Sequence, residues 1–188
     1  MKILMAASEM VPFAKTGGLG DVVGALPKAL LALGEEVRAI LPYYPLFIRD
    51  RFPLETIQGT LRLPFRRRRE VVSLRRWTSL EGLVCYFIGQ ERYFEREGLY
   101  GTPQGDYPDN AERFSCFARG VLELCRVEGF YPDILHVHDW QAALCPVYLR
   151  TLYRKDPGFV QVRSLLTIHN LAYQGIFPAE KFSLTELP

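Results

Sequence analysis

Hydrophobic residues in this chain gather in short unbroken runs, with longer amphipathic stretches between them. An unbroken apolar run predicts a strand that is covered on both faces, as in a parallel sheet. Such runs lie at residues 2–7, 36–41, 133–138 and 164–169. Because these runs alternate with helical patterns, the sequence predicts a Rossmann-like α/β fold with an open, mostly parallel sheet.

Apolar residues at helical spacing predict three helices between these strands. The first follows a glycine-rich loop and ends near Gly34, the second spans residues 110–127 and ends at Gly129, and the third spans 141–153. The expected buried stripes are Val22, Val23, Leu26, Leu30 and Leu33 in the first helix, and Phe114, Phe117, Val121, Leu122 and Cys125 in the second.

The first helix contains two residues that disfavour a helix interior, Gly24 and Pro27. Relative to Ala they cost about 1 and about 3 kcal/mol. We therefore expect tertiary packing to hold this helix, with a kink after Val23.

The pattern changes in the middle of the chain, where three short runs with β character follow one another. They lie at residues 61–63, 71–77 and 83–88, with a turn predicted at 79–82. We interpret them as a β-hairpin excursion inserted into the α/β alternation. A basic run at residues 66–69 is interpreted as a solvated turn, with contact to an anion as the alternative. Residues 91–105 and 170–188 show no long periodicity.

Composition limits the kinds of partner. The 188 residues include 48% hydrophobic residues, and 23 basic against 21 acidic residues give a net charge of +2. This length suits a single domain over residues 1–188, and the charge balance favours neither nucleic acid nor a membrane surface. The longest apolar runs are too short for a secretory signal or a membrane span. The cysteines form no C-x-x-C pair, so Cys85, Cys116, Cys125 and Cys145 are expected to be reduced core thiols of a cytoplasmic protein.

The loop KTGGLGD at residues 15–21 is the strongest local signal for a ligand. Its glycines lack the Cβ atoms that would hold a ligand away from the backbone, and they permit positive φ in a tight turn. The helix that follows adds free N–H donors, and Lys15 adds a charge. The loop is therefore expected to hold a phosphate or sugar hydroxyls, although a turn without any ligand has the same composition.

Polar side chains gather where the predicted strands end. Glu9 follows the first strand, His138 and Asp139 end the third, and His169 and Asn170 end the fourth. Ligands of open parallel sheets bind beyond the carboxyl ends of the strands, so these residues are expected to share one crevice.

Several site classes fit these residues poorly. A dinucleotide fold needs G-x-G-x-x-G and an acidic residue ending the second strand, whereas this chain has Gly18-x-Gly20-x-x-x-Gly24 and no such carboxylate. The Gly-Lys-Ser/Thr of a P-loop and the G-x-S-x-G of a serine hydrolase do not occur in the sequence. His136, His138 and Asp139 remain an alternative metal site that needs a further ligand. Neutral hydroxyls plus phosphate suit the crevice best, which indicates sugar-nucleotide chemistry with no metal and no cofactor.

Four segments together resemble the bacterial glycogen synthases and plant starch synthases. They are SEMVPFAKTGGLGDV at residues 8–22, YPDNAERF at 107–114, HVHDWQ at 136–141 and TIHNLAYQG at 167–175. The resemblance implies a retaining glycosyltransferase with the two-domain GT-B architecture. Its expected partners are the donor ADP-glucose and an α-1,4-glucan acceptor, such as glycogen or a maltooligosaccharide, extended at its non-reducing end.

The resemblance also implies roles for individual residues. Lys15, Gly17 and Gly18 would meet the donor, His169 would lie over the sugar near the reacting carbon, and Asp139 would hold sugar hydroxyls. Glu9 and Tyr100 would face the acceptor. The remaining expected site residues are Asp21, which could instead cap the helix, His138 and Asn170, which could instead be supports, and Gln174, which like Trp140 and Tyr173 could equally serve packing.

The second, nucleotide-binding domain of such enzymes has no counterpart in these 188 residues, and the sheet is expected to continue after Pro188. We therefore expect an amino-terminal part that cannot turn over by itself. The competing interpretation is a non-catalytic glucan-binding or scaffold module. A phosphorylase-like enzyme would need a lysine that carries pyridoxal phosphate, and no segment offers one.

Overall fold

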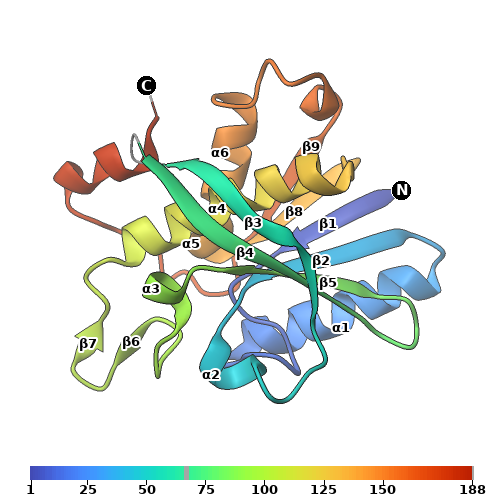
Figure 1. Ribbon diagram of the computed structural model, residues 1–188, viewed down its shortest axis with the longest axis horizontal. Coiled ribbons are helices and arrows are strands. Elements are labelled where there is room, and N and C mark those ends of the chain that lie inside the picture. Colours follow the sequence, from blue (N-terminus) through green and yellow to red (C-terminus); the bar gives the residue numbers. More distant parts are fainter. Residues whose placement is uncertain (66–67, 188) are drawn as a thin grey trace.

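A sheet of seven strands in the order β3-β4-β5-β2-β1-β8-β9 forms the centre of the molecule (Figure 1). The computed structural model describes residues 1–65 and 68–187. The parallel strands are β1 (Lys2–Ala6), β2 (Glu36–Pro42), β5 (Val84–Gly89), β8 (Ile134–His138) and β9 (Arg163–Thr167). The predicted open and mostly parallel α/β sheet is thus confirmed.

The β excursion is confirmed for the first two of its three predicted runs, whereas the third, at residues 83–88, is β5 and pairs parallel with β2. Strands β3 (Glu55–Phe65) and β4 (Arg68–Thr78) pair antiparallel, and β4 pairs antiparallel with β5. β3 is longer than the predicted run at residues 61–63. The interpretation of the basic run 66–69 as a turn was wrong for Arg68 and Arg69, which begin β4 and pair with Phe65 and Pro64 of β3. Residues 66–67 lie outside the described residues.

The two faces of β1 pack against different helices. Ile3 and Met5 form a small cluster with Val37, against which Leu26 and Leu30 of helix α1 (Gly18–Ala32) pack. The alternate residues of β1 belong to the main core, together with the apolar face of helix α4 (Asn110–Glu128). Because neighbouring residues of a strand point to opposite faces, α1 and α4 cover opposite sides of the sheet, as Figure 1 shows.

The predicted stripe of α1 was partly wrong. Val22 and Leu33 are 40% and 77% exposed, whereas Val23 is buried. The reason is that α1 packs closely through Gly24 and Pro27, which are both buried. A Cβ on Gly24 would lie 3.0 Å from the carbonyl oxygen of Val11, so a larger residue would crowd this contact. The expected kink after Val23 stays a prediction.

The second helix was predicted correctly, and the third was not. All five residues of the predicted stripe of α4 are buried, and Gly129 ends the helix in the left-handed conformation at φ 59°. The predicted helix 141–153 is two helices, α5 (Asp139–Ala142) and α6 (Leu144–Arg150). Pro146 explains the break, because it has no N–H for the carbonyl of Ala142 and its ring crowds that carbonyl.

Short elements complete the fold. They are α2 (Pro45–Ile48), α3 (Glu91–Phe94), β6 (Gly101–Thr102), β7 (Gly105–Asp106), η1 (Pro157–Phe159) and η2 (Ala179–Thr185). The segment 91–105, predicted to be irregular, therefore contains α3 and most of the small β6-β7 hairpin, which lies away from the main sheet (Figure 1). β9 forms one edge of the described sheet, and its Leu165 and Leu166 are 51% and 44% exposed. The expected continuation of the sheet stays a prediction.

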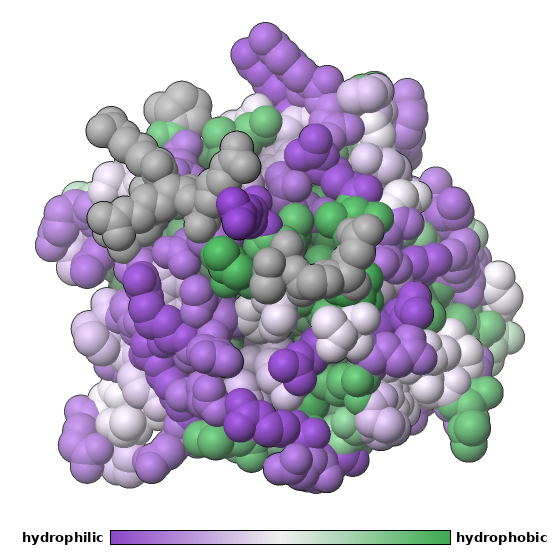
Figure 2. Space-filling view, viewed as in Figure 1, coloured by the Kyte–Doolittle hydropathy of each residue, from purple (hydrophilic) through white to green (hydrophobic). Residues whose placement is uncertain are grey.

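The four cysteines are free and buried, as predicted. Burial raises the pKa of Cys85 and that of Cys125 to about 12, which keeps both thiols protonated and unreactive. Hydrophilic residues cover most of the face shown in Figure 2, and hydrophobic ones gather there in smaller patches. Among the described residues, no helix combines the length and the apolar character that a membrane crossing requires.

Candidate functional site

A cavity of about 580 Å³ lies beyond the carboxyl ends of β1, β8 and β9. It is located where the strand order changes direction, since β1 pairs with β2 on one side and with β8 on the other. Its lining residues are Glu9, Thr16, Gly17, Gly18, Leu19, Val22, Tyr100, Asp106, Asn110, Asp139, Trp140, Gln141, His169, Asn170 and Tyr173. The structure therefore brings together Glu9, Asp139, His169 and Asn170, as the positions of the strand ends predicted, and His138, expected in the same crevice, does not line it. Of the other expected site residues, Gly17, Gly18 and Tyr100 line the cavity as well.

The glycine loop is open toward this cavity. Gly17 and Gly18 are exposed, and a Cβ on either residue would have no other atom within 4 Å. The positive φ that these glycines permit is not used, because Gly17 has φ −145° and neither Gly18 nor Gly20 lies in the positive region. The glycines therefore provide space for close approach to the backbone rather than an unusual turn.

The Glu9 side chain holds this loop from below. Glu9 is a buried residue with 3% of its surface exposed. Its carboxylate accepts hydrogen bonds from the backbone N–H groups of Thr16 (2.6 Å) and Gly17 (3.1 Å). It also accepts from the hydroxyls of Thr16 (2.7 Å) and Tyr100 (2.6 Å). Two of the amides that were expected to receive a ligand are thus already occupied. The donors that remain are those at the start of α1, which no side chain caps.

Lys15 and Asp21 form an exposed ion pair beside the cavity. The Lys15 Nζ donates to both carboxylate oxygens of Asp21 at 2.7 and 2.6 Å, and the two side chains are 46% and 59% exposed. Neither residue lines the cavity. The alternative of Asp21 as helix cap was wrong, because Gly17 is the N-cap residue and no side chain caps the helix. Exposed pairs of this kind stabilise a fold by about 0–1 kcal/mol, so the pair can open for a ligand at little cost.

Stacked histidines form the opposite wall. His138 Nδ1 lies 2.9 Å from His169 Nε2, and His136 Nε2 lies 2.8 Å from the hydroxyl oxygen of Thr167. The ring centres of His138 and His169 are 5.2 Å apart, with nearly parallel planes. His138 is fully buried, so it supports His169 from behind and has no surface for direct contact with a substrate.

Burial keeps the inner two histidines neutral. Burial and the neighbouring His136 and His169 lower the pKa of His138 from 6.5 to about 3. Burial also lowers the pKa of His136. Across residues 1–65 and 68–187, no group of three or more His, Cys, Asp and Glu side chains has an arrangement suited to a metal ion.

Asp139 adopts an unusual backbone conformation at the edge of this wall. Its φ of 56° lies in the left-handed region, which costs a residue with a side chain about 1–3 kcal/mol. Its carboxylate accepts a hydrogen bond from the backbone N–H of His169 at 2.7 Å. This bond explains why β9 ends at Thr167 and not at the predicted residue 169: the amide of His169 turns toward Asp139 and leaves the ladder. Strain of this kind is typical of functional sites.

Asn170 and Gln174 differ in their relation to the cavity. Asn170 lines it and also closes a turn, since its side-chain oxygen accepts from the N–H of Ala172 at 2.9 Å. Gln174 faces a separate, mostly apolar hollow of about 450 Å³ and donates to the carbonyl of Leu171 at 2.9 Å. The structure therefore does not place Gln174 with the other expected site residues.

Sequence reasoning did not select several lining residues, among them Asn110 and Gln141. Both are buried, and the side-chain oxygen of Gln141 has no hydrogen-bond partner within the described part of the chain. Trp140, for which packing was an open alternative, does pack edge to face against Phe114 at 5.0 Å between ring centres. All three residues belong to segments that resemble the glycogen and starch synthases, and this resemblance was the signal in the sequence that could have identified them.

Comparisons with known proteins identify the family of this chain. Over residues 2–188 the chain matches the family described as starch synthase catalytic domain. It is 48% identical over 189 residues to a glycogen synthase of Koribacter versatilis, and 49% identical over 182 residues to one of Syntrophotalea carbinolica. These matches cover 100% and 96% of this chain, and 38% and 37% of the relatives.

A solved structure is similar as well. It is described as the catalytic domain of starch synthase IV from Arabidopsis thaliana bound to ADP and acarbose, and it matches with a TM-score of 0.89 at 35% sequence identity. The match covers 100% of this chain and 37% of that one. The chain thus spans about 38% of the length of the curated relatives that it matches.

Proposed function

Because the chain belongs to the family of starch synthase catalytic domains, we propose that it is the amino-terminal part of a retaining glycosyltransferase with GT-B architecture. The proposed enzyme transfers glucose from ADP-glucose to the non-reducing end of an α-1,4-glucan. The observation that carries this proposal is the cavity between an open, uncapped glycine loop and the wall of His169 and Asp139.

The glycine loop suits the departing diphosphate. In the transfer, the bond between C1 of the donor glucose and the diphosphate oxygen breaks, a bond from C1 to the 4-hydroxyl oxygen of the acceptor forms, and the proton of that hydroxyl passes to the departing diphosphate. Negative charge grows on the diphosphate as the sugar becomes oxocarbenium-like, so groups that stabilise that charge accelerate the reaction. The free N–H groups at the start of α1 and the ammonium group of Lys15, released from Asp21, supply such stabilisation.

The histidine wall suits the sugar. His138 has a buried Nε2 without a partner among the described residues, and an unpaired buried N–H is rarer than an unpaired acceptor. We therefore infer that His138 carries its proton on Nδ1 and donates it to His169 Nε2. His169 then presents its own Nδ1–H as a donor to the sugar, and Asp139 accepts from sugar hydroxyls.

The proposal also covers the acceptor site, a second domain and the cellular compartment. Glu9 and Tyr100 line the cavity on the side of the loop and are proposed to face the glucan. A second, nucleotide-binding domain is proposed to close the cavity and to complete donor binding. We place the protein in the cytoplasm, which four free, buried cysteines support.

Two titrations of the 188-residue chain test the proposal against the alternative of a glucan-binding module. We expect calorimetry to detect binding of ADP-glucose as well as of a maltooligosaccharide, because the glycine loop and Lys15 belong to the donor site. Binding of the maltooligosaccharide alone would favour the module. Radiolabelled ADP-glucose supplied together with glycogen should give no incorporation with this chain alone. Incorporation would contradict the need for a second domain.

A further inference from the structure

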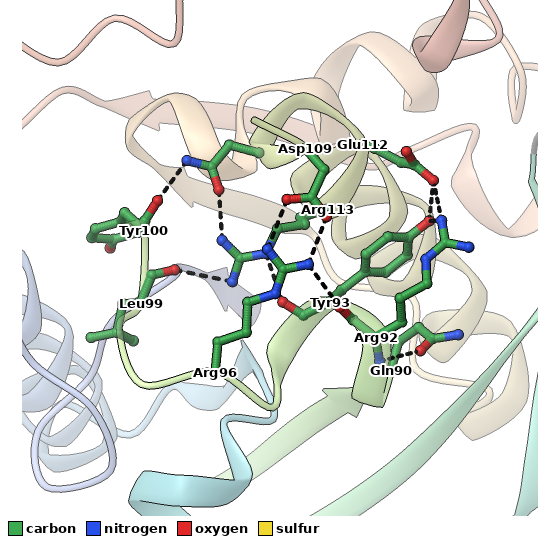
Figure 3. A network of polar contacts seen from close by, with 10 residues as sticks. Gln90, Arg92, Tyr93, Arg96, Leu99, Tyr100, Asp109, Glu112 and Arg113 are labelled. Atoms are coloured by element: carbon green, nitrogen blue, oxygen red, sulfur yellow. Dashed lines mark hydrogen bonds and ion pairs between the residues drawn. The ribbon is translucent and has the colours of Figure 1, made fainter. Parts of the chain in front are cut away.

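The segment YPDNAERF at residues 107–114 has no role in the chemistry proposed above, yet it contains the most deeply buried charge among the residues that the structure describes. Arg113 has 0% exposed surface. Its guanidinium donates to the carbonyls of Tyr93 (2.6 Å) and Leu99 (3.1 Å) and to the side-chain oxygen of Asn110 (2.6 Å). Figure 3 shows these contacts converging on the arginine.

Such an arginine is costly to bury. The three acceptors are neutral oxygens, and burial lowers the pKa of Arg113 from its ordinary value. An apolar side chain at this position would avoid that cost. The geometry explains the arginine differently: one planar group binds both ends of the segment between Tyr93 and Leu99, which a point-like lysine ammonium cannot do.

Asn110 extends this contact toward the cavity. It lies one helical turn before Arg113 at the start of α4, accepts from the arginine and donates through Nδ2 to the carbonyl of Tyr100 at 2.8 Å. Asp109 beside it binds Arg96 through both oxygens, at 2.8 and 2.7 Å, which ties the same segment to α4 a second time (Figure 3).

The segment ends in the side chain that touches Glu9. The Tyr100 hydroxyl donates to Glu9 at 2.6 Å, and Glu9 holds the amides of Thr16 and Gly17. A continuous series of hydrogen bonds therefore leads from Arg113 through Asn110, Tyr100 and Glu9 to the glycine loop.

We propose that Asn110 and Arg113 are positioning residues that set the conformation of the glycine loop through Tyr100 and Glu9. The consequence of this loop conformation for donor binding rests on the function proposed above. The effect on the loop itself does not, because it is a property of the chain without any substrate.

Amide hydrogen exchange in the absence of substrate measures that effect. The Thr16 and Gly17 amides are in exposed residues, so their protection comes from the Glu9 carboxylate. We expect Tyr100→Phe and Asn110→Ala each to accelerate exchange at both amides about tenfold, because the Glu9 carboxylate is then no longer held in place by the Tyr100 hydroxyl and protects the amides less well. Arg113→Lys should do the same, since lysine cannot replace the planar contacts.

A matched control separates positioning from general loss of stability. Ser115 is a buried residue of the same helix, and its hydroxyl donates to the carbonyl of Ala111 and also contacts the side chain of Tyr148. Ser115→Ala should leave exchange at Thr16 and Gly17 unchanged. Exchange that accelerates equally in Ser115→Ala, or that stays unchanged in both Tyr100→Phe and Asn110→Ala, would overturn the proposal.

The double variant gives the sharpest result. Once Tyr100→Phe has removed the hydroxyl, residue 100 no longer contacts Glu9 through a hydrogen bond, so its position no longer affects Glu9. The variant that combines Tyr100→Phe with Asn110→Ala should therefore exchange as fast at Thr16 and Gly17 as Tyr100→Phe alone. Accelerations that multiply would mean that the two residues act independently, which contradicts the proposal. In the two-domain enzyme the same non-additivity is expected in the affinity for ADP-glucose. Its absence there, with non-additive exchange, would count against the proposed function and not against this inference.

Discussion

The two walls of the cavity are built from opposite kinds of interaction. The glycine wall is held by charge: a Glu9 carboxylate beneath it accepts four hydrogen bonds, and an exposed Lys15-Asp21 pair flanks it. The histidine wall is held by neutral rings, since burial keeps His138 uncharged against His169. A wall that must receive an anion needs donors left over, and a wall that must receive hydroxyls needs fixed neutral groups. The comparison therefore predicts different responses to mutation and to pH.

The largest effect is expected where charge is removed from the glycine wall. Glu9→Gln keeps the shape of the side chain but replaces one acceptor oxygen by an NH2 group that faces other donors. We expect the free energy of unfolding to fall by about 2–3 kcal/mol, measured by urea denaturation. Glu97→Gln, the same change at an exposed residue, should alter it by less than about 0.5 kcal/mol. Equal effects of the two substitutions would mean that Glu9 does not hold the loop.

The next effect concerns ligand binding without a change in stability. Lys15→Ala removes an exposed ammonium group, so we expect the affinity of the two-domain enzyme for ADP-glucose to fall about tenfold to a hundredfold. The melting temperature should barely change, because exposed pairs contribute little. Lys15→Arg keeps the charge with a different geometry, so its affinity for ADP-glucose should lie between that of the unaltered enzyme and that of Lys15→Ala. Lys28→Ala, on the exposed side of α1, is the control. Loss of affinity in the control would remove the argument for a specific role of Lys15.

The smallest effect is a pH dependence that belongs to the histidine wall. His138 has a lower pKa folded than unfolded, so the unfolded chain binds the proton more readily as the pH falls below 6.5. Its contribution to stability is therefore complete above that pKa and is lost toward acid pH. From about pH 7 to about pH 5.5 we expect a loss of about 1 kcal/mol from this residue. His138→Asn should remove that part of the pH dependence, and Ser115→Ala should keep it. An unchanged slope in His138→Asn would place the acid sensitivity elsewhere.

The sequence predicted the parts of this arrangement that depend on local pattern. Apolar runs located the parallel strands, and the polar residues at their ends located the cavity, because strand direction alone brings those ends together. The break in the third helix was not predicted, although its cause is local, since Pro146 lies in the first turn of α6.

What the sequence did not predict depends on contacts between distant residues. The residues next to Glu9 in the sequence do not indicate that its carboxylate accepts hydrogen bonds from the amides of Thr16 and Gly17. These bonds form only because the glycine loop folds back over the end of β1. The same holds for Tyr100, which reaches Glu9 across 91 positions of sequence. The exposure of Val22 and Leu33 follows from the packing of α1 through Gly24 and Pro27, which the periodicity of apolar residues does not indicate.

The central claim is that the open backbone at the start of α1 receives the diphosphate of the donor. Gly18→Ala tests it most directly, because the added methyl group meets no protein atom within 4 Å and occupies only the space left for the ligand. Calorimetric titration of the two-domain enzyme with ADP-glucose should show an affinity about tenfold lower or more, while the melting temperature stays unchanged or rises. An affinity equal to that of the unaltered enzyme would contradict the account.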